Sequence, residues 1–333
     1  MKQIGVIGAG SWGTSLANLL AKEGYAVTLW VYEAELAERM AITAENDLYL
    51  PRIKLSQNLT ATQNLSEAVK GKQLLLFVPP SQVLRQVFSQ ARAEIGENAL
   101  LVFASKGVEN NTLLTMSEVV EQVAPGSLQR SAFLSGPSFA REVAEELPTA
   151  VAVAADNPAV AEQVQEVFST RYFRTYTNQD VIGTELGGAL KNVIALAAGV
   201  SDGLGFGHNT RAALVTRGLA EITRIGLAKG AQQETFAGLA GMGDLVLTCT
   251  GDLSRNRSVG MELGKGRTLQ EILSGMQMVA EGVKTTLSAY QLAEKLGVEA
   301  PLIEQMYLIL YQEKPARQAV QDLMLRELKA EQH

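Results

Sequence analysis

The first half of the chain alternates short apolar runs with amphipathic segments. Runs rich in Val, Ile, Leu and Ala predict strands over residues 3–7, 26–30, 74–78, 100–104, 132–134 and 149–155. Two of them, 74–78 and 100–104, are apolar at every position, which is typical of strands buried on both faces of a parallel sheet. Helical spacing of apolar residues predicts helices over 14–22, 84–95 and 113–123. This alternation predicts a doubly wound sheet.

The pattern changes near residue 180. From Glu185 onward, amphipathic segments are separated by glycine-rich turns and strand-like runs are few, so the second half is predicted to be helical. The segment around 178–184 contains no Pro/Ser-rich linker. We therefore expect two closely packed domains, 1–181 and 182–333, with a ligand cleft between them.

The sequence Gly8-Ala9-Gly10-Ser11-Trp12-Gly13 has the pattern G-x-G-x-x-G and lies between a predicted strand and a predicted helix. In this setting the first glycine permits a tight turn, the second lets a pyrophosphate approach the backbone, and the third allows close packing of the helix. The amides at the helix N-terminus then bind the phosphates. The fold class expected is therefore α/β, an N-terminal Rossmann-like doubly wound sheet followed by an all-α C-terminal domain. A glycine-rich turn without a cofactor is the alternative.

The residues after the second predicted strand bear on the choice of dinucleotide. Glu33 follows Tyr32 there, and an acidic residue at this place hydrogen-bonds the ribose of NAD, whereas an arginine accepts the 2′-phosphate of NADP. Glu33 fits equally well as a carboxylate at a helix N-terminus. The pattern favours NAD but leaves both cofactors open.

Composition narrows the chemistry. The chain has 333 residues with 47% hydrophobic and 19% charged content, which describes a globular protein large enough for two domains. A net charge of −6 argues against nucleic acid as the principal partner. We expect no membrane span and no export signal, because glycines interrupt the apolar N-terminus, and hence a cytoplasmic protein.

Histidine and cysteine are scarce. Cys249 is the single cysteine, and His208 and His333 are the two histidines, so a His/Cys zinc cluster is excluded and no metal site is expected. His208 is expected to hydrogen-bond within a loop, and Cys249 to be a small buried residue. Proton transfer therefore has to depend on His208 or on a residue other than histidine.

Lys191 is the strongest candidate for that role. On a helix through 184–198 its neighbours at positions −4, −3, +3, +4 and +7 are glycine, alanine or isoleucine, and none is a carboxylate. Desolvation among such neighbours lowers the pKa of a lysine toward the working range of a general acid or base. A lysine that extends from an interdomain surface into water is the alternative.

Further polar groups follow predicted strands or glycine turns. Asp244 and Thr248 have i, i+4 spacing, so Asp244 would orient an ammonium or a hydroxyl, or simply cap a helix. Residues 254–258 read Ser-Arg-Asn-Arg-Ser before an amphipathic stretch, a combination suited to a phosphate or to an ordinary surface. Segments 105–107 and 135–138 follow strands at the carboxyl edge of the sheet, where such folds bind ligands or make turns.

Read together, these segments resemble the bacterial-type, NAD(P)-dependent sn-glycerol-3-phosphate dehydrogenases along nearly the whole chain. The motifs that carry the resemblance are GAGSWGT at 8–14, FVPP at 77–80, SKG at 105–107, GPSFA at 136–140, ELGGALKN at 185–192, GDL at 243–245, SRNR at 254–257 and EG at 281–282. Their order along the chain makes the resemblance specific.

The resemblance implies reversible hydride transfer between the nicotinamide and C2 of glycerol 3-phosphate, which interconverts this alcohol with dihydroxyacetone phosphate for glycerophospholipid synthesis. Lys191 matches the proton-transfer lysine of the family. The positions that match substrate contacts or their near neighbours are Lys106, Gly136, Ser138, Lys191, Asn192, Asp244, Thr248, Ser254, Arg255 and Asn256. Besides the glycines Gly8, Gly10 and Gly13, the positions that match cofactor contacts are Ser11, Trp12, Tyr32, Lys106, Ala140, Arg255, Val279 and Glu281. The family commonly has a basic residue where Tyr32 and Glu33 stand, so NAD is expected to serve at least as well as NADP.

Two other functions remain open at this point. One is a related dehydrogenase acting on a small hydroxy acid or ketopantoate, and the other is a protein that senses nicotinamide cofactors without turnover. The apolar helical half is compatible with a homodimer.

Overall fold

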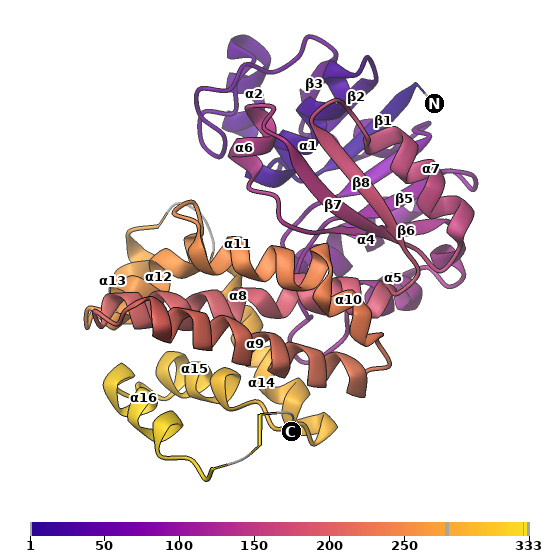
Figure 1. Cartoon of the computed structure of the whole chain (residues 1–333). Helices are drawn as coiled ribbons and strands as arrows, with labels where there is room; N and C mark the ends of the chain where they lie inside the picture. Colours follow the sequence, from indigo (N-terminus) through magenta and orange to yellow (C-terminus); the bar gives the residue numbers. More distant parts are fainter. Residues whose placement is uncertain (1, 277–279, 329, 332–333) are drawn as a thin grey trace.

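The computed structural model describes residues 2–276, 280–328 and 330–331 and shows an α/β lobe followed by a helical lobe (Figure 1). The predicted fold class is confirmed: a mostly parallel sheet with helices on its faces forms the N-terminal part, and the following part is helical. Aliphatic and aromatic residues on the two faces of the sheet form one core region each.

One sheet organises the N-terminal lobe, with the strand order β3-β2-β1-β4-β5-β6-β7-β8. The strands span β1 Gln3–Ile7, β2 Ala26–Trp30, β3 Leu59–Thr62, β4 Leu74–Phe77, β5 Leu100–Phe103, β6 Ser131–Ser135, β7 Thr149–Ala154 and β8 Phe173–Asn178. Neighbouring strands are parallel except β6 and β7, which pair antiparallel with Ser135 opposite Ala152. The chain between β6 and β7 turns back at the carboxyl edge without a crossover to the other edge, and an antiparallel neighbour follows.

Short and regular helices cover this sheet. They are α1 Ser11–Lys22, α2 Ala34–Thr43, α3 Leu65–Val69, α4 Leu84–Ala91, α5 Met116–Val123, α6 Ala140–Ala144 and α7 Pro158–Phe168. Helix α5 begins later than the predicted residue 113, because Asn111 and Leu113 have positive φ angles of 70° and 60° and Thr115 forms a capping box with Glu118.

The helical lobe surrounds one central helix. Its elements are α8 Val181–Gly203, α9 His208–Ala228, α10 Gln233–Ala237, the π-helical turn η4 Leu239–Gly243, α11 Asp244–Thr250, α12 Arg255–Gly264, α13 Leu269–Ser274, α14 Glu281–Leu296, α15 Pro301–Tyr311 and α16 Ala316–Met324. By length and composition α8 would suffice to cross a membrane, yet 94% of its apolar window is buried inside the protein. It is therefore the core helix of this lobe.

Helix α8 also reaches the sheet. A Cβ on Gly188 would lie 2.3 Å from Oγ of Ser135, so the helix backbone touches the last residue of β6. Lys191 follows one turn later, and its side chain therefore lies close to the carboxyl edge of the sheet.

Candidate active site

Lys191 lies in the interior between the two lobes. Its ammonium donates hydrogen bonds to Oδ1 of Asp244 and, over 2.9 Å, to Oγ1 of Thr248. The side chain is 9% exposed. Burial lowers the pKa of Lys191 to about 8, although Asp244 raises it, and the nearby charge of Lys106 lowers it further. The buried ammonium is thus poised to exchange a proton near neutral pH.

Asp244 joins two lysines from different lobes. Its Oδ2 accepts a 2.7 Å hydrogen bond from Lys106, which follows β5 and also donates to the carbonyl of Gly136 over 3.2 Å. Asp244 starts α11, where the i, i+4 spacing places Thr248 on the same face. The turn before it packs tightly on α8, since a Cβ on Gly187 would lie 2.4 Å from the carbonyl oxygen of Ala240. One carboxylate therefore holds both ammonium groups beside the sheet edge.

The N-terminus of α12 lies next to this cluster. Ser254 caps the helix by accepting a hydrogen bond from the amide of Arg257. The side-chain amide of Asn256 donates to Oδ1 of Asn192 over 3.0 Å and accepts from the amide of Gly282 over 3.0 Å. These contacts fix the first turn of α12 against α8 and α14. The free amides of such a turn and a guanidinium beside it suit an anion.

Arg255 extends from that turn toward the glycine loop. Its Nη2 donates a 2.6 Å hydrogen bond to Oγ of Ser11, the first residue of α1. Glu281, at the start of α14, completes the surroundings: burial raises its pKa, and the positive charges of Arg255, Lys106 and Lys191 oppose that rise. The guanidinium of Arg255 thus joins the glycine loop to the N-terminus of α12.

The glycine loop has the shape that a dinucleotide needs. Gly8 has φ +115°, which favours glycine, and a Cβ on Gly13 would lie 1.9 Å from the carbonyl oxygen of Gly8. A Cβ on Gly10 would meet no atom within 4 Å, and no side chain caps α1. The space beside Gly10 and the amides of α1 therefore fit a pyrophosphate. Asn46 supports the loop by donating to the carbonyl of Ala9 over 2.8 Å.

Some residues expected at the site lie at its margin. Tyr32 is 79% exposed, with its ring edge-on to Trp30, and the carboxylate of Glu33 accepts a 2.7 Å hydrogen bond from Tyr49. Glu33 is the N-cap residue of α2 without bonding its amides. Ala140 begins α6.

The sequence also singled out Ser138, Val279, His208 and Cys249. Ser138 donates to the carbonyl of Gly136 over 2.9 Å. Val279 lies outside the described residues. His208, expected in a loop, is instead the exposed first residue of α9, because the helix begins directly after Gly207. Cys249 is buried, and burial raises the pKa of its thiol to about 12.

Sequence reasoning missed several polar residues that support the site. Glu185 accepts hydrogen bonds from the amide and hydroxyl of Ser117 across the lobes, and Asp202 binds two arginines. Asn46 binds the glycine loop from 37 residues away. Their partners are distant in sequence, so no local pattern signals them. Within the described ranges, no three His, Cys, Asp or Glu residues are grouped to hold a metal ion.

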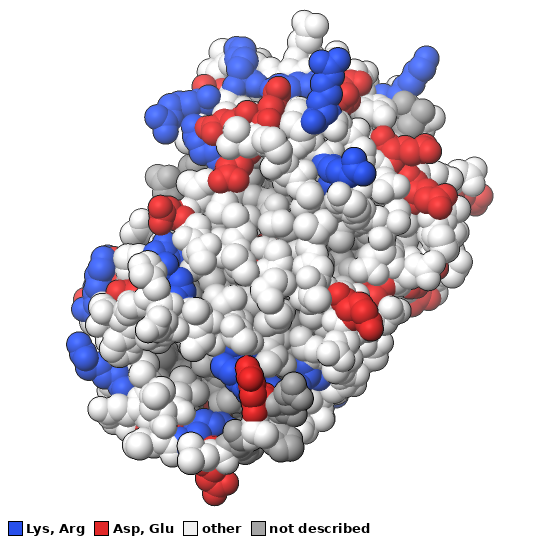
Figure 2. Space-filling model, viewed as in Figure 1, with Lys and Arg blue, Asp and Glu red and all other residues white. Residues whose placement is uncertain are grey.

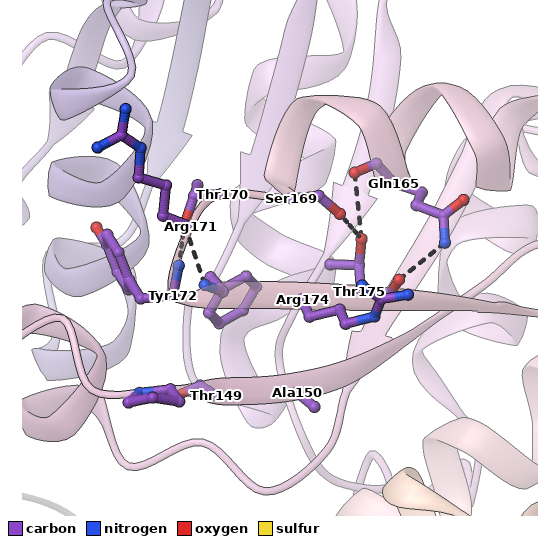
Figure 3. Close-up of a pocket in the computed structure, with 11 residues that line it drawn as sticks. Thr149, Ala150, Gln165, Ser169, Thr170, Arg171, Tyr172, Arg174 and Thr175 are labelled. Atoms are coloured by element: carbon purple, nitrogen blue, oxygen red, sulfur yellow. Dashed lines mark hydrogen bonds between the residues drawn. The ribbon is translucent and has the colours of Figure 1, made fainter.

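Two hollows elsewhere share no lining residue with this cluster. One, of about 640 Å³, lies along the edge strand β8, where Arg171 and Arg174 extend in different directions (Figure 3). The other, of about 450 Å³, lies among α9, α15 and α16. Figure 2 shows positive and negative side chains interspersed at both ends of one face, with a largely uncharged middle. Lys106 and Lys191 both bind Asp244 in the cluster described above, which lies apart from both hollows.

Comparison with known proteins follows the same division of the chain. A family model described as NAD-dependent glycerol-3-phosphate dehydrogenase N-terminus matches residues 3–161, and one described as the C-terminus of the same enzyme matches 180–321. The chain is 64% identical to a glycerol-3-phosphate dehydrogenase [NAD(P)+] of Syntrophotalea carbinolica, over 98% of this chain and 99% of that protein. It is also 64% identical to the protein of the same name from Geobacter sp. strain M21, over 99% of each chain.

Solved structures give the same result. A glycerol-3-phosphate dehydrogenase from Coxiella burnetii superimposes with a TM-score of 0.92 at 39% identity, covering 98% of this chain and 99% of that one. A ketopantoate reductase from Ralstonia eutropha JMP134, at 15% identity and a TM-score of 0.61, shares the fold alone.

Proposed function

Because this chain belongs to the family of NAD-dependent glycerol-3-phosphate dehydrogenases, we propose that it interconverts dihydroxyacetone phosphate and sn-glycerol 3-phosphate with NAD or NADP. It is an oxidoreductase that acts on a CH–OH group. The observation that carries the proposal is the buried ammonium of Lys191, held by Asp244 and Thr248, with Lys106 bound to the same carboxylate. A sensor without turnover has no need of such a group.

In the reducing direction, Lys191 acts as the general acid. A dinucleotide held at the glycine loop would supply the hydride for C2 of the substrate. Lys191 polarises the carbonyl and delivers a proton to its oxygen, so that no free alkoxide forms. With a pKa of about 8, Lys191 is mostly protonated at neutral pH, and the charge of Lys106 eases loss of the proton. Asp244 holds both lysines in place. In the oxidising direction, neutral Lys191 accepts the proton.

Binding of the phosphate orients C2 for this reaction. Arg255, Asn256 and the first amides of α12 hold the phosphate. Because the phosphate is fixed, C2 is held in a reactive geometry, which raises the rate. The remaining groups proposed to surround the substrate are Lys106, Gly136, Ser138, Asn192, Thr248 and Ser254. In support, Lys106 and Ser138 both donate to the carbonyl of Gly136, Thr248 accepts from Lys191, and Asn192 accepts from Asn256.

The cofactor is proposed to lie along the glycine loop and the carboxyl edge of the sheet. The residues assigned to it are Gly8, Gly10, Ser11, Trp12, Gly13, Tyr32, Lys106, Ala140, Arg255, Val279 and Glu281. The indole Nε1 of Trp12 is buried without a partner among the described residues, which suits a site that a ligand completes. Glu33 follows β2 by three residues, in the region where a ribose would come, so NAD serves at least as well as NADP.

The same proposal covers the setting of the enzyme. We place the division between dinucleotide and catalytic domains at 181/182, near the start of α8. The protein acts in the cytoplasm, supplies sn-glycerol 3-phosphate for glycerophospholipid synthesis, and forms a homodimer through its helical lobe.

The deciding experiment follows the absorbance of reduced nicotinamide with dihydroxyacetone phosphate, with ketopantoate as the alternative substrate. We expect oxidation of the cofactor with the phosphorylated ketone and little with ketopantoate. Lys191→Ala should lose several orders of magnitude in turnover while still binding the cofactor. Binding without turnover in the unaltered enzyme would support the sensor, and retained turnover in Lys191→Ala would remove the lysine from proton transfer.

A further inference from the structure

Helix α12 carries the residues proposed to hold the substrate phosphate, and an ion pair between Asp202 and Arg257 joins its first turn to α8. We propose that Asp202 and Arg257 are positioning residues that set the first turn of α12 relative to Lys191, and thereby the affinity for the phosphorylated substrate. The inference rests on the proposed function. Neither side chain is among those assigned to the substrate or the cofactor.

Helices α8 and α12 touch at backbone distance. A Cβ on Gly199 would lie 2.0 Å from the carbonyl oxygen of Arg257, and one on Gly260 would lie 2.0 Å from that of Leu196. The same closeness recurs one turn further along, at Gly203 and Gly264. Such a seam brings the helices into close contact, and Val259 and Leu263 of α12 pack with α8 in one apolar core.

A buried ion cluster adds a directional, charged bond between the two helices to the amide contact of Asn256 with Asn192. Oδ2 of Asp202, in the last turn of α8, accepts a 2.8 Å hydrogen bond from Nε of Arg257, in the first turn of α12. The Oδ1 atom accepts from Arg211 of α9 over 2.6 and 3.1 Å. The side chain of Asp202 is 7% exposed and that of Arg257 12%. At this depth the pair is little screened and its geometry is directional.

The position of this pair connects it to the site. Arg257 follows Arg255 by two residues, and its amide also donates to the capping hydroxyl of Ser254. Asp202 lies on the same continuous helix as Lys191, about 16 Å along its axis. The pair therefore ties the phosphate-binding turn to the helix that carries the proton donor. The second partner of Arg257, Asp252, is fully solvated and constrains it far less.

The chain provides a matched control. Arg211 binds the same carboxylate but belongs to α9, so Arg211→Lys disturbs the cluster without touching α12. Asp202→Asn and Arg257→Lys instead weaken the bond that reaches α12, because an amide carries no charge and a lysine lacks the planar fork of arginine. All three side chains lie outside the residues proposed to touch substrate or cofactor.

The test measures KM for dihydroxyacetone phosphate, kcat, the pH profile of kcat and the thermal midpoint for the three variants. For Asp202→Asn and Arg257→Lys we expect KM to rise about tenfold or more, since small misplacements of a binding group are costly, with kcat changed less than about twofold. The alkaline limb of the kcat profile should stay in place, because Lys191, Asp244 and Thr248 lie on α8 and α11. Arg211→Lys should leave KM unchanged.

Two results would overturn the inference: a KM at the unaltered value in both α12-directed variants, or an equal rise in Arg211→Lys at a similar loss of thermal midpoint. Titration with inorganic phosphate by calorimetry gives an independent measure. Affinity for phosphate should fall in Asp202→Asn and Arg257→Lys alone. If the unaltered enzyme fails to reduce dihydroxyacetone phosphate, the proposed function is wrong. The phosphate titration would still show whether Asp202 and Arg257 set the anion affinity of the first turn of α12.

Discussion

At the scale of single residues, burial governs the acid–base chemistry of Lys191. Its pKa of about 8 lies below the usual lysine value because the ammonium is desolvated. Reduction needs the protonated lysine, so kcat for reduction should fall as pH rises through about 8. Oxidation needs the neutral amine and should gain over the same range. Initial rates in both directions from pH 6 to 10 would show the two opposed curves.

Asp244, which raises the pKa of Lys191, provides the control variant. Asp244→Asn removes the carboxylate that stabilises the ammonium, and the midpoint of both profiles should move to lower pH. Parallel rather than opposed profiles in the unaltered enzyme would contradict a proton-transfer role for Lys191.

Arg255 should matter through the phosphate of the substrate. Its guanidinium lies at the start of α12 and donates to Ser11, between the two proposed binding regions. We expect Arg255→Ala to raise KM for dihydroxyacetone phosphate by about 10- to 100-fold, as for loss of a charge-assisted hydrogen bond, and to affect dihydroxyacetone far less. Steady-state kinetics with both ketones would measure this.

A variant of a surface arginine controls for the loss of one positive charge in Arg255→Ala. Arg267 pairs with Glu262 and is half exposed, and Arg267→Ala should leave both Michaelis constants unchanged. Equal losses on the two ketones in Arg255→Ala would argue against a phosphate contact.

At the scale of elements, a buried carboxylate of α9 caps the N-terminus of α15. Glu221 of α9 accepts hydrogen bonds from the amides of Leu302 and Ile303, over 2.8 and 3.1 Å. Burial nevertheless raises its pKa to about 7. The folded state therefore binds a proton more readily than the unfolded chain, so this contribution to stability is full below the ordinary pKa of glutamate and is lost as pH rises through about 7.

Glu221→Gln tests this sign. The unaltered protein should lose up to about 3 kcal/mol of unfolding free energy through Glu221 between acidic and mildly alkaline pH, whereas the variant should lose correspondingly less. Urea unfolding at pH 5 and pH 8 would give the four values. Glu185, whose pKa is also raised to about 7 by burial, remains in both proteins and supplies an equal background. Identical pH dependence in the two proteins would show that Glu221 stays ionised throughout.

Elements with a strong periodic signal were predictable from sequence, and those without one were not. The central strands β4 and β5 are continuous apolar runs because both faces are buried. The edge strands β3 and β8 were missed, since each is half polar and covered on fewer sides. The antiparallel placement of β7 depends on the path of the chain after β6, which apolar spacing does not encode.

The site shows the same limit. The small neighbours of Lys191 predicted desolvation, and the structure places that side chain in the interior. Asp244 and Thr248 could be paired because i, i+4 spacing is local. The bonds from Asp202 to Arg257 and from Glu185 to Ser117 span 55 and 68 residues, so they exist only once the helices have packed. Sequence therefore predicts residues that act within one element better than those that join two.

At the scale of the whole molecule, α8 of the helical lobe also binds the N-terminal lobe. Its Glu185 accepts hydrogen bonds of 2.8 and 2.5 Å from the amide and hydroxyl of Ser117, at the start of α5. Lys229, directly after α9, adds a second bridge to Glu118 of α5. Polar bonds that are buried across an interface couple the stabilities of its two sides, because breaking the interface leaves the carboxylate of Glu185 without partners.

Unfolding should therefore be one transition for both lobes. Trp12 and Trp30 are the two tryptophans of the chain and both lie in the N-terminal lobe, so fluorescence reports that lobe, while circular dichroism reports mainly the helical lobe. The two denaturation midpoints should coincide. Ser117→Ala, which removes one donor from a buried carboxylate, should lower the unfolding free energy by about 1–3 kcal/mol for both probes alike. Ser274→Ala, at an exposed hydroxyl of α13, should change neither. A shift confined to fluorescence would show that the lobes unfold independently and that α8 does not couple them.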